Sequence, residues 1–139
     1  MSRRVWLVYG PPEEEEFLIT GAGEEVRWTI HRDAVVGDDV LFYLRAPVSA
    51  IMAIGTILTK PKKSPWAEKW SKVMPYGAQM RVTKPCAPRI EFRQMADDEE
   101  LSKAWGLVRA QMQSTNGPQI VLPSILTLLR DNHGLEMDS

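Results

Sequence analysis

The sequence predicts an α+β protein whose strands form a curved, mostly antiparallel β-barrel flanked by short helices. Two observations support this fold class. Five or six short segments have the apolar, β-branched composition of strands and end at glycine or proline. Between them lie short segments with the start signals of helices. The chain has 139 residues without an internal repeat or a low-complexity linker, so we expect a single domain spanning residues 1–139.

The first 60 residues contain three predicted strands. Residues 5–9, "VWLVY", form a buried strand that ends at Gly10-Pro11-Pro12. Residues 11–20 form a short helix, because proline and a run of acids suit a first helical turn. Residues 24–33 show no clear periodicity. The second and third strands are expected at 40–45, after a turn at Gly37-Asp38, and at 49–58, where an almost unbroken apolar run indicates that both faces are covered.

Pro61 ends the third predicted strand, and the remaining elements follow it. Ser64-Pro65 predicts the start of a helix over 65–72, in which Trp66 and Trp70 share one face. Two strands are expected on either side of a turn at Lys84-Pro85-Cys86. The predicted segments, in order, are strands 76–84 and 89–95, an amphipathic helix 97–112 with apolar residues at 101, 105, 108 and 112, a loop with a short strand at 114–123, and a closing helix 124–133 before Gly134.

Charge is unevenly distributed along the chain. Residues 60–93 carry nine basic and two acidic side chains, a net charge of +7, whereas the whole chain has a net charge of −1 and the remainder therefore −8. Such a basic segment attracts a polyanion locally. The alternative is a solvated face, which is the commoner explanation of a charge run.

Chemistry for catalysis is sparse in this sequence. The histidines, His31 and His133, are far apart, and Cys86 is the only cysteine, without a motif that lowers its pKa. No phosphate-binding glycine loop, HExxH or paired CxxC occurs. We therefore expect no enzyme activity, no cofactor and no metal site. A lone cysteine favours the cytoplasm, and no segment is long enough to cross a membrane.

Five tryptophans are many for a chain of this length. Trp6 and Trp105 lie in apolar patterns and are expected in the core. Trp28, Trp66 and Trp70 lie in short or irregular segments next to charged residues. Large rings beside lysines are typical of base recognition, because every base offers a face for stacking while the cations hold phosphates. The alternative is that these rings plug the open end of the barrel.

The order of several segments resembles the EVE domain of the PUA-like superfamily and, more distantly, the YTH domains. The similar segments are "VWLVY", "RWT" with Trp28, "VVGDDVLFYLRAP", "IMAIGTIL", "PYGAQMRV" and "QIVLP", which together span residues 4–134. This resemblance implies a PUA-like barrel flanked by helices. It also implies binding of DNA or RNA, with one flipped, modified base held in an aromatic-lined pocket.

The resemblance also implies individual site residues. Trp28 would form one pocket wall and Trp66 or Trp70 another, while Tyr9 would be a polar residue of the pocket and Thr29 would read the base edge. Family members contact backbone phosphate through the loop that corresponds here to 114–119, which would involve Ser114 and Asn116. The basic segment adds four expected phosphate contacts, Lys60, Lys62, Lys63 and Lys69.

Three functions are therefore weighed from the sequence. The first is a non-catalytic module that captures a modified, for example methylated, base in DNA or RNA. The second is an enzyme or ligand-binding protein for a free nucleobase or small metabolite, with His31 as general base. The third is a protein-interaction domain of a larger complex. The sequence does not choose between DNA and RNA, and it does not specify the modification.

Overall fold

The computed structural model describes residues 4–72, 74–113 and 117–137. Within them, seven strands form one sheet in the order β2-β6-β4-β3-β1-β7, with β5 paired to β6. The strands are β1 (Val5–Gly10), β2 (Glu25–Thr29), β3 (Asp39–Leu44), β4 (Ala50–Ile57), β5 (Lys62–Lys63), β6 (Tyr76–Glu91) and β7 (Gln119–Val121). The helices are the 3-10 helix η1 (Pro12–Glu14), α1 (Glu15–Thr20), α2 (Pro65–Trp70), α3 (Phe92–Asp97), α4 (Glu99–Ala104), α5 (Gly106–Arg109) and α6 (Pro123–His133).

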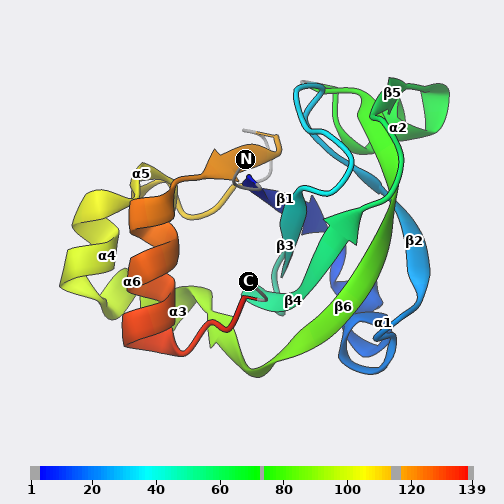
Figure 1. Ribbon diagram of the computed structural model, residues 1–139. Helices are drawn as coiled ribbons and strands as arrows, with labels where there is room; N and C mark the ends of the chain where they lie inside the picture. Colours follow the sequence, from blue (N-terminus) through cyan, green and yellow to red (C-terminus); the bar gives the residue numbers. More distant parts are fainter. Residues whose placement is uncertain (1–3, 73, 114–116, 138–139) are drawn as a thin grey trace.

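The sheet is mixed but mostly antiparallel. Only β1 and β3 run parallel among the described strand pairs. The long strand β6 curves through the molecule and pairs with β2, β4 and β5, so that it links the edge strand β2 to the central strand β4 (Figure 1). The predicted fold class, an α+β protein with a curved and mostly antiparallel sheet and short helices, is confirmed.

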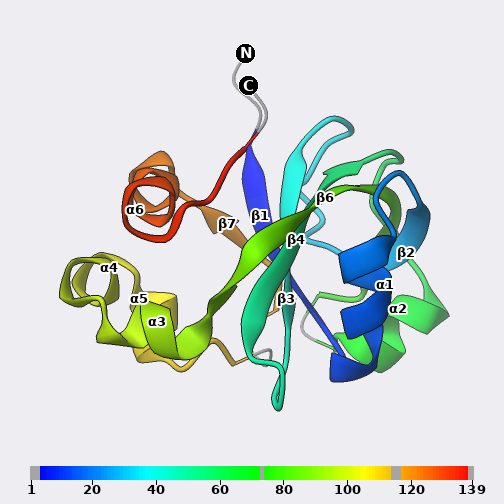
Figure 2. The same ribbon diagram turned by 90° about the horizontal axis from the view of Figure 1, so that it is seen from below.

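Both faces of the central strands are covered. Val5, Leu7 and Tyr9 of β1 belong to a core cluster that includes side chains of α4 and α6, whereas Trp6 and Val8 point into a second cluster around Trp28. Figure 2 shows the four helices α3 to α6 on one side of the sheet and α1 and α2 on the other. This arrangement explains the unbroken apolar runs in β1, β3 and β4, because alternate side chains enter different cores.

The prediction of two strands around Pro85 is wrong. One strand, β6, continues from Tyr76 to Glu91, and the predicted second strand becomes helix α3 from Phe92 onward. Proline lacks a backbone donor, which sheets tolerate at irregular positions. The pairing of β6 with β4 shifts register on both sides of Ala53, the partner of Pro85. The bulged ladder therefore carries the proline without ending the strand.

The helix predicted over 97–112 is divided into two. Helix α4 ends at Ala104, Trp105 has an extended backbone, and α5 begins at Gly106. The side chains at 101, 105, 108 and 112 are nevertheless buried, as their spacing predicted. Asp98 caps α4 by accepting a hydrogen bond from the backbone of Leu101, and this bond holds the pKa of the Asp98 carboxyl below its usual range.

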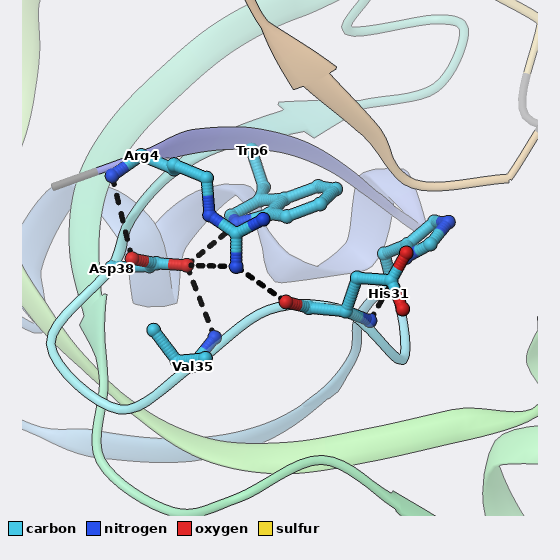
Figure 3. A network of polar contacts seen from close by, with 6 residues as sticks. Arg4, Trp6, His31, Val35 and Asp38 are labelled. Atoms are coloured by element: carbon cyan, nitrogen blue, oxygen red, sulfur yellow. Dashed lines mark hydrogen bonds and ion pairs between the residues drawn. The ribbon is translucent and has the colours of Figure 1, made fainter.

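Residues 24–33, which show no periodicity, contain the edge strand β2. A buried carboxylate, Asp38, fixes the loop that follows this strand. Its Oδ2 accepts hydrogen bonds from Trp6 Nε1 and from the backbone N–H of Val35, both at 3.0 Å, and lies 3.5 Å from Arg4 Nη2 (Figure 3). The Trp6 ring in turn stacks on His31, with ring centroids 5.1 Å apart. The network ties the loop to β1 and holds Trp6 in the core, as expected from the sequence.

Replacing Asp38 by alanine is expected to lower the free energy of unfolding by about 3 kcal/mol, because a buried donor on Trp6, a part-buried donor on Val35 and the paired Arg4 lose their acceptor. Urea denaturation measures this change. The matched control is Asp33→Ala, since the Asp33 side chain is 63% exposed and its loss is expected to cost less than about 0.5 kcal/mol. Equal effects of the two substitutions would contradict a structural role for the Asp38 network.

Candidate functional site

A cavity opens where the end of β1 faces β2 and α2. Its volume is about 170 Å³. An engineered apolar cavity of roughly 150 Å³ holds a benzene ring, so this space matches one six-membered aromatic ring. We call it the tryptophan cavity, and its lining residues are Tyr9, Gly10, Pro11, Glu14, Val26, Arg27, Trp28, Thr29, Arg45, Trp66, Ser71, Gly117 and Pro118.

Trp28 forms a fixed wall of this cavity. The side chain lies on β2 and is only 7% exposed. Its Nε1 donates a hydrogen bond of 2.8 Å to the carbonyl oxygen of Tyr9, and its ring packs edge-on against Phe42. Gly10 lies directly against the ring, where a Cβ atom would overlap the indole. The indole is therefore held by contacts on several sides, and its position does not depend on a ligand.

Trp66 forms the second aromatic wall. It lies in the first turn of α2 and is half-buried, with its ring against Gly77 of β6. Gly77 pairs with Thr29 of β2, so the strand pairing brings α2 beside the Trp28 segment. The guanidinium of Arg27 lies over the Trp66 ring, 4.5 Å from its centroid, which is cation–π geometry. Two tryptophans distant in sequence thus converge on one cavity.

The polar lining groups differ in charge and in partners. Thr29 is buried, and its hydroxyl makes no hydrogen bond to any described residue. Ser71 Oγ accepts a hydrogen bond from the backbone of Met74. Within the described residues, the side chains of Arg45 and Glu14 have neither an ion pair nor a hydrogen bond. The cavity therefore combines aromatic walls with unpaired groups of both signs.

Tyr9 belongs both to the cavity lining and to the core cluster on the helical side of the sheet. It lines the cavity, but its ring packs edge-on against Tyr43 and its hydroxyl oxygen is buried without a partner among the described residues. Burial raises the pKa of the Tyr9 phenol, so the group stays protonated and neutral. The backbone carbonyl that holds Trp28 is the contribution of Tyr9 that the structure shows directly.

The remaining predicted site residues are not gathered at the cavity. Four lysines are exposed and do not line it, although Lys62 and Lys63 of β5 and Lys69 of α2 belong, with Lys60, to the segment that carries Trp66. We call residues 60–72 the basic arm. The side chain of Trp70 lies outside the described part of the structure, as do Ser114 and Asn116, while Gly117 and Pro118 of the same loop do line the cavity.

Sequence reasoning missed several lining residues. Arg27, Arg45 and Glu14 are the charged residues of the cavity lining within the described part of the chain, and Gly10 gives the space in which Trp28 lies. Arg27 is directly next to Trp28, and Gly10 ends a predicted strand, so both had a positional signal. Arg45 and Glu14 had no such signal in the sequence. Arg45 simply lies at the end of a predicted strand, and Glu14 lies within a run of four glutamates.

The candidate catalytic groups lie elsewhere. His31 is not among the lining residues; its Nδ1 accepts a hydrogen bond from the backbone of Asp33, and its ring stacks on Trp6. Cys86 packs against the core cluster on the helical side, and burial raises the pKa of its thiol to about 11. In the described part of the chain, no three potential ligands are grouped to hold a metal ion, and no helix is long and apolar enough to span a membrane.

Comparisons with known proteins establish the fold. No protein-family model matches the sequence, and no curated protein matches it. Solved structures do match over nearly the whole chain. A protein from Agrobacterium tumefaciens is 18% identical, with 94% of this chain and 93% of that chain covered and a TM-score of 0.67. Human THYN1, solved in complex with DNA containing 5-methylcytosine, is 15% identical, with 96% and 99% covered and a TM-score of 0.67.

An ASCH protein from Zymomonas mobilis is similar at a greater distance. It is 10% identical, with 92% of this chain and 94% of that chain covered and a TM-score of 0.57. At these identities, the similarity concerns the fold. The fold of this chain matches that of the PUA-like EVE family, as the order of its sequence segments implied.

Proposed function

We propose that this protein, which has the fold of the PUA-like EVE family, is a non-catalytic nucleic-acid binding module that holds one modified base in the tryptophan cavity. The observation that carries the proposal is the convergence of Trp28 and Trp66 on a space of about 170 Å³, the size of one aromatic ring. Apolar walls with a few polar groups are typical of a specific ligand site. The nucleic-acid complex of human THYN1, a protein of similar fold, supports the same class of ligand.

The walls and the polar groups have different roles in this proposal. Stacking one base on an aromatic ring contributes roughly 1 to 3 kcal/mol and is insensitive to sequence. Burial of an added methyl group contributes only about 0.8 kcal/mol, a preference of roughly fourfold. The tryptophans therefore set affinity, while hydrogen bonds from groups such as the Thr29 hydroxyl set which base is accepted. A weakly paired base also costs less to extrude, which adds selectivity.

Cationic side chains at two places suit the phosphate backbone. Arg27 and Arg45 line the cavity, and the exposed lysines of the basic arm, Lys60, Lys62, Lys63 and Lys69, lie in the segment that carries Trp66. A nucleic-acid strand with one base in the cavity would pass these cationic groups. The arrangement favours binding of a polymer over binding of a free nucleobase, which would need no cations outside the cavity.

The experiment that tests the function is binding of short single- and double-stranded DNA and RNA, plain and modified, followed by quenching of tryptophan fluorescence. If about four phosphates of a single strand are neutralised, log K falls with log salt at a slope near −3. A fourfold rise in salt then weakens binding roughly 50-fold. Binding of nucleosides alone, with no dependence on salt, would instead support a small-ligand protein.

A pair of variants assigns the salt effect to the basic arm. Lys62→Ser with Lys63→Ser is expected to reduce the slope by about 1.4, because two phosphate contacts are lost. The control is Lys103→Ser on α4, whose ammonium pairs with Glu99 and which does not line the cavity. Equal slopes for the wild type and the double variant would remove these lysines from the interface.

A further inference from the structure

Among the described residues that line the tryptophan cavity, Glu14 is the only acidic one. It closes the 3-10 helix η1, where its backbone N–H donates to the carbonyl oxygen of Pro11 at 3.2 Å. The next acid along the chain, Glu15, is engaged, because its carboxylate lies 2.6 Å from Arg89 Nη1. The Glu14 carboxylate has no such partner in the described part of the structure. An acidic residue without an ion pair to any described residue therefore belongs to the lining of a cavity that we assign to a base.

The chemistry of a carboxylate restricts what it can face there. An ionised carboxylate only accepts hydrogen bonds. It repels phosphate, and the ring face of a base offers it no donor. Within DNA, its partners at this position are thus the N–H groups on the edge of the base, and in RNA the 2′-hydroxyl is a further donor. Arg27 and Arg45, which line the same cavity, have the opposite preference and suit phosphate or carbonyl oxygens.

We propose that Glu14 selects a cytosine-type base by accepting a hydrogen bond from its exocyclic 4-amino group. The inference rests on the proposed function of the cavity. Cytosine offers a donor at this edge, and acceptance by Glu or Asp is a recognised way to read it. A uracil-type base places a carbonyl oxygen at the same point, where two acceptors face each other without a proton. The volume of about 170 Å³ accommodates the single ring of a pyrimidine.

A local structural role does not account for Glu14. Acidic side chains at the start of a helix interact favourably with its dipole, but Glu13, Glu15 and Glu16 supply that charge as well. Glu13 is in the same 3-10 helix, is exposed and does not line the cavity. It therefore offers a matched control that removes the same charge from the same turn.

The test uses pairs of oligonucleotides that differ only in one base, cytosine against uracil and 5-methylcytosine against thymine, with dissociation constants measured by fluorescence quenching. Wild-type protein is expected to bind the amino base about tenfold more tightly than its keto partner. Glu14→Gln keeps the shape of the side chain, but its amide can donate as well as accept. The ratio is then expected to fall to within about twofold, mainly through tighter binding of the keto base. Glu13→Gln is expected to keep the wild-type ratio.

The possible outcomes separate this inference from the function on which it rests. Oligonucleotides that bind in a Trp66-dependent manner, with equal constants for amino and keto bases, would overturn the role of Glu14 and leave the proposed function intact. A Glu14→Gln variant that loses affinity equally for both bases, at an unchanged melting temperature, would also overturn it. Failure of every oligonucleotide to bind the wild type would overturn the proposed function and the inference together.

Discussion

Replacing Trp66 by alanine is expected to weaken oligonucleotide binding by about 5- to 150-fold, the equivalent of roughly 1 to 3 kcal/mol of stacking. Trp66 is half-buried and lies in a short helix outside the two core clusters, so the fold should survive its loss. Without the indole, the Arg27 guanidinium also loses the ring over which it lies. Fluorescence anisotropy of a labelled oligonucleotide measures the affinity, and thermal melting checks the fold.

The control for this variant is Trp66→Phe, which keeps an aromatic face and is expected to retain most of the affinity. An alanine variant that binds as tightly as the wild type would place the base somewhere other than the tryptophan cavity. Loss of affinity in both variants, by the same factor, would indicate that Trp66 acts through the position of α2 and not through stacking.

Replacing Trp28 by alanine is expected to lower both the stability of the protein and its affinity for nucleic acid. Trp28 is buried among Gly10, Phe42 and the end of β1, so its removal should lower the free energy of unfolding by about 3 to 5 kcal/mol. The carbonyl oxygen of Tyr9 loses its hydrogen-bond donor at the same time. Urea denaturation measures the loss, and binding by the folded fraction should fall with every nucleic acid tested.

Trp28→Phe separates packing from hydrogen bonding in this wall. It keeps most of the ring but not the Nε1 donor, and the expected cost is roughly 1 to 2 kcal/mol. A Trp28→Ala variant that loses less than about 1 kcal/mol of stability would contradict the packing described for this residue. Unchanged binding by that variant would show that the base is not held against Trp28.

The sequence predicted a strand correctly where the strand is a continuous apolar run. Strands β1, β3 and β4 are apolar throughout because they are covered on both sides, and such runs are visible in the sequence. Strand β2 lacked this signal, since it lies at an edge and exposes Arg27 and Glu25. The continuity of β6 across Pro85 was missed for another reason. Pro85 has the local signature of a turn, and only its tertiary pairing with Ala53 keeps the strand extended.

The site was predictable only in part. Resemblance to a family pointed to Tyr9, Trp28, Thr29 and either Trp66 or Trp70, and the lining of the cavity includes Tyr9, Trp28, Thr29 and Trp66. The local excess of positive charge pointed to the lysines of the basic arm. The tertiary fold, however, decides which basic side chains border the cavity. Arg45 lines it because the end of β3 pairs with the end of β1. No property of the residues around Arg45 in the sequence encodes that proximity.

Each aromatic wall of the cavity lies directly against a glycine, Trp28 against Gly10 and Trp66 against Gly77. A methyl group added at either glycine would overlap the indole, so these two positions act as spacers that fix where the rings lie. A substitution there would change the shape of the cavity, while the side chains of the polar lining groups kept their chemistry. Selectivity for size and selectivity for hydrogen bonding can accordingly be tuned separately in this protein.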